Sequence, residues 1–295
     1  MPTARVGELE ICWDEVGDPA GRPLLLVMGL ASQMIHWDEE LCAALAERGH
    51  HVIRFDNRDV GRSSKLEAAG MPDVLAAYRA VAAGEPVAAP YRLRDMAADA
   101  VGLLDALGIA SAHVVGASMG GMIAQTMAIE HPTRVRSLTS IMSTTGHPSL
   151  PPARPEAMAA LLAPVAHDRE GNVERAVQVF RTIGSPGFPF DEAHVRRRAG
   201  RAYDRGHHPP GPARQLVAIL ASGSRRRALG AVRAPTLVVR GTDDPLVPVE
   251  GGVDTAQAIP GAELLLVEGM GHDLPRPVWP RLVDAITRLT TRADA

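Results

Sequence analysis

A short β-branched run that ends at a serine between glycines constrains the fold of this chain more than any other feature. Val114-Val115 leads into Gly116-Ala117-Ser118-Met119-Gly120, and residues 122–130 have the composition of a helix. In this order of strand, Gly-x-Ser-x-Gly and helix, the serine lies on a sharp turn with its hydroxyl exposed, and small flanking residues let strand and helix approach closely. The first N–H groups of the helix point to the same place, which suits a developing negative charge. The pattern therefore predicts that Ser118 is a nucleophile on a strand-to-helix turn.

Strand patterns alternate with helical patterns along most of the chain. This alternation predicts an α/β fold with a mainly parallel, doubly wound sheet whose central strands are covered on both faces. The predicted strands are 8–16, 24–28, 51–56, 112–115, 135–142, 236–240 and 263–267, and the predicted helices are 93–107, 122–130, 253–258 and 277–289.

Two segments interrupt this alternation. Residues 65–90 are rich in alanine and predict one or two short helices. Residues 147–230 contain two proline clusters, no convincing strand, and thirteen arginines against seven acidic residues. Because both ends of the longer segment return to sheet elements, we expect a helical cap or lid inserted into one core formed by 1–146 and 231–295. An independent domain is the less favoured alternative.

Composition excludes several classes of protein. A net charge of −3 gives no electrostatic reason to expect binding to nucleic acid or to a membrane surface, and 3% aromatic residues provide no platform for stacking bases. We expect the arginine runs 196–198 and 225–227 to be solvated helix faces, and His207-His208 lacks the spacing of a metal site. Cys12 and Cys42 predict buried thiols in a reducing compartment. With no leader-like apolar segment near Met1 and no apolar run of about 18 residues, the expected location is cytoplasmic.

Several loop motifs, each following a predicted strand, resemble those of the α/β-hydrolase family over essentially the whole chain. Within that family the chain is most similar to serine esterases and methylesterases of the aclacinomycin methylesterase type. The resemblance implies an eight-stranded, mostly parallel twisted sheet flanked by helices, with the cap inserted after strand six. The motifs are Val27-Met28-Gly29-Leu30, residues 56–63 (Asp-Asn-Arg-Asp-Val-Gly-Arg-Ser), Gly116–Gly120, Gly241-Thr242-Asp243-Asp244-Pro245 and Gly269-Met270-Gly271-His272.

A serine nucleophile needs a base, and the base needs an acid partner that fixes its tautomer. His272 is the candidate base, since it lies in a glycine-rich turn just after the last predicted strand. Asp243 and Asp244 both follow a strand, so position alone does not choose between them. The resemblance implies Asp244, because related hydrolases carry the acid immediately before the proline of Gly-x-x-Asp-Pro.

The resemblance also implies an oxyanion hole formed by the backbone N–H groups of Leu30 and Met119. Met28 stands where many relatives have histidine, which changes the polarity around the hole but not its backbone donors. Gly29, Met34 and Trp37 are candidate pocket residues, although packing is the simpler explanation for the latter two. The remaining polar residues of the second motif are expected to form a structural, hydrogen-bonded loop: Arg58, Asp59, Arg62 and Ser63.

Together these features predict a serine hydrolase, free of cofactor and metal, that cleaves carboxylic esters through an acyl-enzyme. The low aromatic content of the cap suggests an apolar pocket for a small or medium acyl or alkoxy group. The expected partner is a small-molecule ester, and the chain is expected to be a monomer or a homodimer. The alternatives are a C–C hydrolase, a thioesterase or a perhydrolase with the same triad, or a ligand-binding receptor of the same fold.

Overall fold

The computed structural model, which describes residues 1–166 and 168–295, contains an eight-stranded sheet with strand order β1-β2-β4-β3-β5-β6-β7-β8. β2 runs antiparallel to both of its neighbours, and β3 to β8 are parallel to one another, as the sequence predicted. The strands are β1 (Thr3–Val6), β2 (Leu9–Val16), β3 (Arg22–Val27), β4 (His50–Phe55), β5 (Ala112–Ala117), β6 (Val135–Ile141), β7 (Thr236–Gly241) and β8 (Glu263–Val267).

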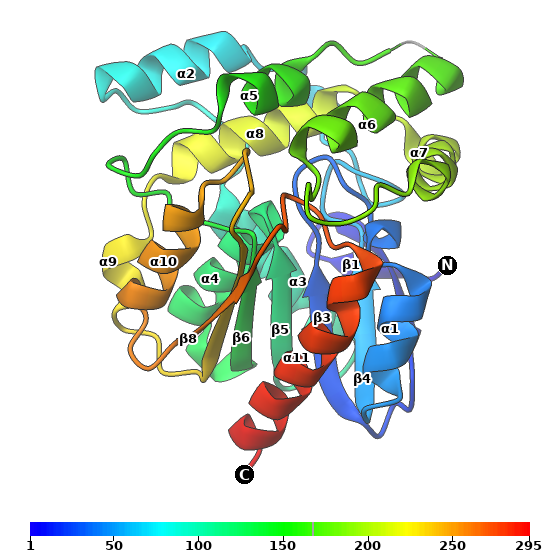
Figure 1. Ribbon diagram of the computed structural model, residues 1–295, viewed down its shortest axis with the longest axis vertical. Coiled ribbons are helices and arrows are strands. Elements are labelled where there is room, and N and C mark those ends of the chain that lie inside the picture. Colours follow the sequence, from blue (N-terminus) through cyan, green and yellow to red (C-terminus); the bar gives the residue numbers. More distant parts are fainter. Residues whose placement is uncertain (167) are drawn as a thin grey trace.

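Helices connect the strands from β3 onward and cover both faces of the sheet (Figure 1). The α-helices are α1 (Glu39–Ala46), α2 (Val74–Ala83), α3 (Leu93–Ala106), α4 (Met119–Glu130), α5 (Pro155–Leu162), α6 (Arg169–Ile183), α7 (Glu192–Gly206), α8 (Pro210–Ser222), α9 (Arg226–Leu229), α10 (Val249–Ala258) and α11 (Trp279–Ala293). Short 3₁₀ turns are η1 (Met34–His36), η2 (Glu67–Ala69), η3 (Pro132–Arg134) and η4 (Arg276–Val278).

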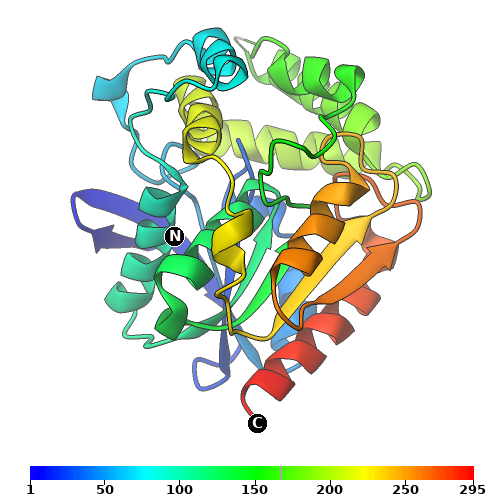
Figure 2. The ribbon, with the colours of Figure 1, turned by 90° about the vertical axis from the view of Figure 1, so that its left-hand side faces the viewer.

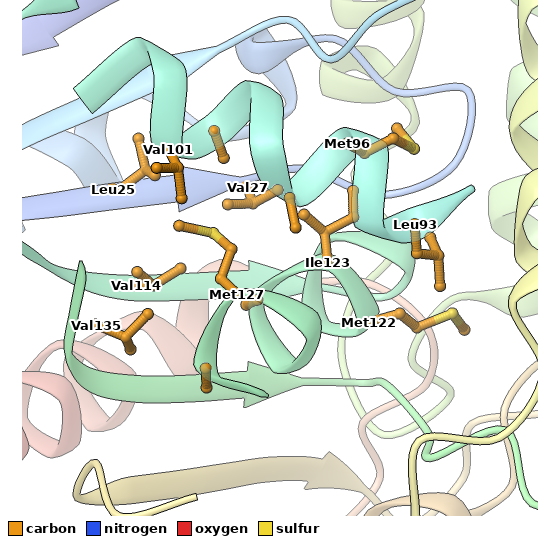
Figure 3. Packing of buried hydrophobic residues seen from close by; sticks show 14 of the residues in the cluster. Leu25, Val27, Leu93, Met96, Val101, Val114, Met122, Ile123, Met127 and Val135 are labelled. Atoms are coloured by element: carbon orange, nitrogen blue, oxygen red, sulfur yellow. The ribbon is translucent and has the colours of Figure 1, made fainter. Parts of the chain in front are cut away.

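The core consists of two apolar layers, one on each face of the sheet. On one face, residues of β3 and β5 such as Leu25 and Val114 pack against α3 and α4, and Figure 3 shows Val101 and Met127 of those helices among them. On the other face, α1 and α11 pack against the sheet through residues such as Leu41 and Ile286. β4, β5 and β7 are buried along their whole length, so apolar residues occupy consecutive positions in each strand, as in Val52-Ile53, Val114-Val115 and residues 237–239.

Helices α5 to α8 lie above the edge of the sheet where the parallel strands end, together with α2 (Figures 1 and 2). α2 packs against α8, α5 against α6, and α6 against α7. The two interruptions of the sequence pattern thus meet in one helical layer. As predicted, the described part of 147–230 contains no strand, and 65–90 holds one α-helix and one 3₁₀ turn.

At the end of the inserted segment, the structure differs from the expectation that arginines 225–227 form a solvated helix face. α9 packs against α4 and α10, and Leu229 belongs to the core cluster on that face of the sheet. Arg225, directly before α9, is only 7% exposed, so the prediction of a solvated face at 225–227 is wrong for this residue. Its guanidinium donates to the side chain of Gln125 and to the carbonyl oxygen of Thr144.

Element boundaries agree with the sequence patterns to within a few residues, but the sequence analysis predicted no helix at α1 (Glu39–Ala46). Two further differences lie near the ends of the chain. The sequence placed no strand at β1, a four-residue edge strand whose side chains are exposed or half-buried and whose order comes from antiparallel pairing with β2. The final helix begins at Trp279 and continues to Ala293, past the expected end at Leu289. Both differences lie where local pattern is weakest, at an exposed strand and at a helix end.

Cys12 and Cys42 are free and buried, as predicted. Among the described residues, the helices are too short or too polar to cross a membrane. In the same part of the chain, no three side chains of histidine, cysteine, aspartate or glutamate are grouped so that they could hold a metal ion.

Candidate active site

Ser118 occupies the turn between β5 and α4 in a backbone conformation that few residues adopt. Its φ of 55° and ψ of −120° lie in the left-handed half of the Ramachandran plot, where a side chain is strained. The neighbouring structure holds it there: its N–H donates to the carbonyl oxygen of Ile141, 2.9 Å away, and its own carbonyl oxygen accepts from the N–H of Gly121. The strain presents the side chain above the sheet instead of along the strand.

The flanking glycines are required because backbones meet closely at this turn. A Cβ on Gly116 would lie 2.1 Å from the carbonyl oxygen of Gly120, and one on Gly120 would lie 2.0 Å from that of Val27. A Cβ on Gly29 would lie 3.1 Å from the Cβ of Ser118. The end of β3 and the serine turn are therefore in direct contact, which explains why both motifs are built from small residues.

His272 reaches Ser118 from the loop after β8. Its Nε2 lies 2.9 Å from the hydroxyl oxygen of Ser118, and its backbone N–H donates over 2.7 Å to the carbonyl oxygen of Ile183 at the end of α6. The same loop is bonded twice more to the α6–α7 connection, from Gly271 N–H to Ser185 Oγ and from Gly187 N–H to the Gly269 carbonyl. The inserted helices thus fix the position of this loop.

Asp244 lies on the far side of the imidazole, after β7. Its Oδ2 is 2.7 Å from His272 Nδ1, and since a carboxylate can only accept, Nδ1 carries the proton and Nε2 is free to accept from the serine hydroxyl. Its Oδ1 accepts from the backbone N–H groups of Leu246 and Val247, both at 2.9 Å. Asp243 instead accepts from Thr242 Oγ1 and from Gly269 N–H, away from the imidazole. The structure brings Asp244, and not Asp243, to His272.

The charge of Asp244 is offset by its surroundings although its side chain is buried. Burial acts to raise the pKa of this carboxyl, but His272, Arg240 and the Val247 N–H together hold the pKa below its usual value. Apart from the contact with His272, the ion pair with Arg240 is the only one that Asp244 forms within the described residues; Nη1 lies 2.9 Å from Oδ2, and both side chains of this pair are inaccessible to solvent.

The predicted oxyanion loop lies against Ser118 and is fixed from two sides. Asn57 Nδ2 donates to the Met28 carbonyl over 2.9 Å, and the Ala31 N–H donates to Gln215 Oε1 of α8 over 3.0 Å. Ala31 has a φ of 61°, so the loop between these anchors turns sharply. Leu30 lies between the anchors, and Met119 begins α4, where the first N–H groups have no partner within the helix.

The two candidate pocket residues Met34 and Trp37 lie in the core. Met34 is inaccessible to solvent and packs in a small cluster with Cys12 and Ile35. Trp37 is 1% exposed and belongs to the cluster beneath α1 and α11. Packing explains both residues, while Gly29 lies directly beside the serine.

The loop after β4 has the structural role that the sequence predicted. Asp59 pairs with Arg214 of α8 and accepts from the hydroxyl of Tyr91, and Arg58 pairs with Asp99 of α3. Ser63 Oγ bridges the Cys12 N–H and the Asp56 carbonyl.

This fold and this hydrogen-bonded serine, histidine and aspartate define a class of protein. The chain belongs to the α/β-hydrolase fold family, whose model matches residues 22–275. Rhodomycin D methylesterase DauP of Streptomyces sp. strain C5 is 33% identical to it over 99% of each chain. A protein of Variovorax paradoxus named as the carbamate hydrolase RutD is 32% identical over 88% of each chain. Among solved structures, the meta-cleavage product hydrolase CumD of Pseudomonas fluorescens IP01 has a TM-score of 0.76 at 18% identity, covering 99% of this chain and 98% of CumD.

Sequence reasoning missed three polar residues that hold the site: Arg240 behind Asp244, Gln215 on the oxyanion loop and Ser185 on the histidine loop. Gln215 and Ser185 are separated from their partners by 184 and 86 positions, and nothing local marks them. For Arg240 a local signal existed. Gly251-Gly252 lies inside helix α10, where glycine is unfavourable, and both glycines make room for the arginine side chain.

Proposed function

We propose that the protein is a cofactor-independent serine hydrolase that cleaves carboxylic esters of small or medium apolar substrates through an acyl-enzyme. Membership of the hydrolase family and full-length similarity to methylesterases support the class of carboxylic ester hydrolase. The observation that carries the mechanism is the continuous line of hydrogen bonds from Ser118 through His272 to Asp244.

Each residue of this line has one task in the first half-reaction. Ser118 Oγ attacks the ester carbonyl carbon while His272 Nε2 takes the hydroxyl proton, and Asp244 stabilises the resulting imidazolium. The tetrahedral oxyanion is bound by the N–H groups of Leu30 and Met119; losing one such donor typically costs about 2.7–4 kcal/mol of transition-state stabilisation. His272 then protonates the departing alkoxide, and the C–O bond to the alcohol breaks.

In the second half-reaction, water replaces the alcohol. His272 takes a proton from the water as the water oxygen attacks the acyl-enzyme carbonyl. As the tetrahedral intermediate collapses, the C–O bond to Ser118 breaks and His272 returns the proton to Ser118 Oγ. The products are the free acid and the original enzyme, so no redox partner or metal is required by the balance of atoms.

The helices of 147–230 are proposed to act as the cap that selects the substrate. α5 to α8 lie above the carboxyl edge of the sheet, on the side where Ser118 is presented (Figure 1). A methyl ester is one candidate substrate, supported by the activity after which the methylesterase relatives are named. A carbamate is the second candidate, supported by the similarity to RutD.

The test combines active-site labelling with a substrate panel. A fluorophosphonate should label Ser118, as located by peptide mass mapping, and Ser118→Ala should lower kcat by a factor on the order of 10⁴–10⁶ with an unchanged thermal transition. Chromogenic esters graded in acyl length and alcohol size should be hydrolysed, with carbamates and aminoacyl amides as comparison substrates.

The outcomes separate the alternatives. Turnover of carbamates or amides but not of esters would replace the proposed reaction while keeping the triad. Tight binding of small molecules with no turnover of any substrate would favour a receptor. Ordinary activity in Ser118→Ala, or label on another residue, would overturn the mechanism.

A further inference from the structure

One oxygen of the proposed catalytic acid is shared between the imidazole of His272 and the guanidinium of Arg240. Asp244 Oδ2 accepts from His272 Nδ1 at 2.7 Å and from Arg240 Nη1 at 2.9 Å, whereas Oδ1 is fully used by the backbone N–H groups of Leu246 and Val247. An imidazolium at His272 therefore has to compete with a permanent guanidinium charge for the same atom.

Arg240 cannot move away from this position easily. Its side chain is inaccessible to solvent, and Nη2 also donates to the carbonyl oxygens of Ser143 and Pro248 at 3.1 and 3.0 Å. A Cβ on Gly252 would lie 2.9 Å from both Cβ and Cγ of Arg240. The chain thus accepts an unfavourable glycine pair inside α10 to hold a buried charge against Asp244.

We propose that Arg240 is a positioning residue of the active site that, by sharing Asp244 Oδ2 with His272, sets how readily the imidazole takes up a proton. This inference rests on the proposed function. The guanidinium holds Asp244 Oδ2 through an ion pair at 2.9 Å. It also offsets the carboxylate charge, which leaves less negative charge to stabilise an imidazolium at His272.

The size of the effect follows from the separation of the charges. When His272 is protonated, the imidazolium and the guanidinium lie two hydrogen bonds apart. At the effective dielectric constant of about 20 that describes protein sites, loss of their repulsion in a variant without the guanidinium corresponds to about one to two pH units in the His272 midpoint. Burial lowers the pKa of Arg240, whereas Asp244 and Glu250 act in the opposite direction. Because an arginine side chain keeps its proton in proteins, Arg240 acts here as a permanent positive charge.

Three other charged groups surround these residues. Asp273 follows His272 in the chain and is held by Ser185; burial raises its pKa, although Ser185, Arg198 and His272 act to lower it. Arg198 of α7 acts on Asp273, and Glu250 of α10 acts on Arg240. Neither Arg198 nor Glu250 is bonded to Asp244 within the described residues, so the arginine that decides its charge is Arg240.

The test measures protonation of His272 directly, without relying on turnover. The full-length protein carrying ¹³C-labelled histidine is titrated by NMR, with the His272 signal assigned from its loss in His272→Gln. Arg240→Gln keeps a donor near Asp244 but removes the charge, and should move the His272 midpoint up by about one pH unit or more. Arg240→Lys keeps the charge and should move it much less. Arg225→Gln is the matched control, because it removes another buried guanidinium that has no carboxylate partner in the described chain.

If the protein hydrolyses esters, the acid limb of its kcat/KM profile should move by the same amount in Arg240→Gln. Gly252→Ala provides a second route should Arg240→Gln not fold, since the added methyl displaces the arginine stem and should move the midpoint in the same direction by a smaller amount. An unmoved or lowered midpoint in a folded Arg240→Gln, or an equal shift in Arg225→Gln, would overturn the inference. An absence of ester hydrolysis with the shift intact would instead count against the proposed function alone.

Discussion

Asp244 and Asp243 show how differently two adjacent carboxylates can be placed. Asp244 is 4% exposed and has every lone-pair direction used, by two backbone N–H groups, an imidazole and a guanidinium. Asp243 is exposed and bonds a neighbouring hydroxyl and the Gly269 N–H. Their difference arises from the direction in which the chain turns after β7, since Asp244 initiates the turn that its own Oδ1 stabilises.

This contrast gives a prediction for the two amide variants. Asp244→Asn should lower kcat by a factor of about 10³–10⁴, because an amide at this position stabilises the wrong imidazole tautomer and no longer offsets the imidazolium. Asp243→Asn should change kcat by less than about threefold. The measurement is the steady-state kcat of both variants on one activated ester. A larger loss of kcat in Asp243→Asn than in Asp244→Asn would assign the catalytic acid to Asp243.

At the scale of elements, two loops that carry reacting groups are each anchored by the inserted helices. The α6–α7 connection bonds the loop of His272 through Ile183 and Ser185. α8 bonds the oxyanion loop through Gln215, which accepts from Ala31 N–H and donates to the Arg58 carbonyl. The inserted segment therefore does more than cover the site, because two of its elements fix parts of the proposed catalytic machinery.

Gln215→Leu should consequently lower kcat by about 10- to 100-fold with little change in KM, since the Leu30 N–H would no longer be held toward the oxyanion. Gln215→Glu, which can still accept from Ala31 N–H, should lose less. Gln178→Leu, on the exposed face of α6, is the matched control. Inhibition constants for a boronic acid that mimics the tetrahedral state should rise in parallel with the loss of kcat. A rise in KM alone would show that Gln215 serves substrate binding and not the oxyanion loop.

At the scale of the whole molecule, buried ion pairs join the inserted helices to the core. Arg214 of α8 pairs with Asp59 at 2.6 Å, and Arg205 of α7 pairs with Asp56 at 3.0 Å, with both carboxylates inaccessible to solvent. Burial acts to raise the pKa of Asp59, but Arg214, the Leu66 N–H and the Tyr91 hydroxyl hold the pKa below its usual value. Removing one partner of such a pair typically costs about 3–5 kcal/mol, because the other charge is left buried without compensation.

The sign of the pH dependence follows from this lowered pKa. A carboxyl with a lower pKa in the folded than in the unfolded state contributes stability above its unfolded pKa of 3.8, and this contribution is lost as the pH falls through the folded value. Asp99 changes the pH dependence of stability in the opposite direction, since burial raises its pKa. The free energy of unfolding of the native chain should therefore be compared with that of Arg214→Met. Both chains contain Asp99, so its contribution cancels in the difference.

Urea unfolding between pH 3 and 6 should show that Arg214→Met is less stable than the native chain at pH 6 by about 3–5 kcal/mol, and that the difference narrows toward pH 3. Asp59→Asn combined with Arg214→Met should recover part of the loss at pH 6, because no uncompensated charge then remains. A difference that stays constant across this pH range would show that packing of the arginine stem, and not its charge, stabilises the junction.

The sequence by itself determined the alternating strands and helices, the strained serine turn and the order of the three polar residues, because each depends on local requirements. A strand covered on both faces favours consecutive apolar residues such as Val114-Val115, and the turn at Ser118 needs glycine where backbones nearly touch. The resemblance to hydrolases added Asp244, which spacing alone left open. The tertiary structure alone decided the partners of Arg240, Gln215 and Ser185 and the burial of Arg225. These side chains bond residues tens to nearly two hundred positions away, and their environment exists only after the sheet and the inserted helices have closed around them.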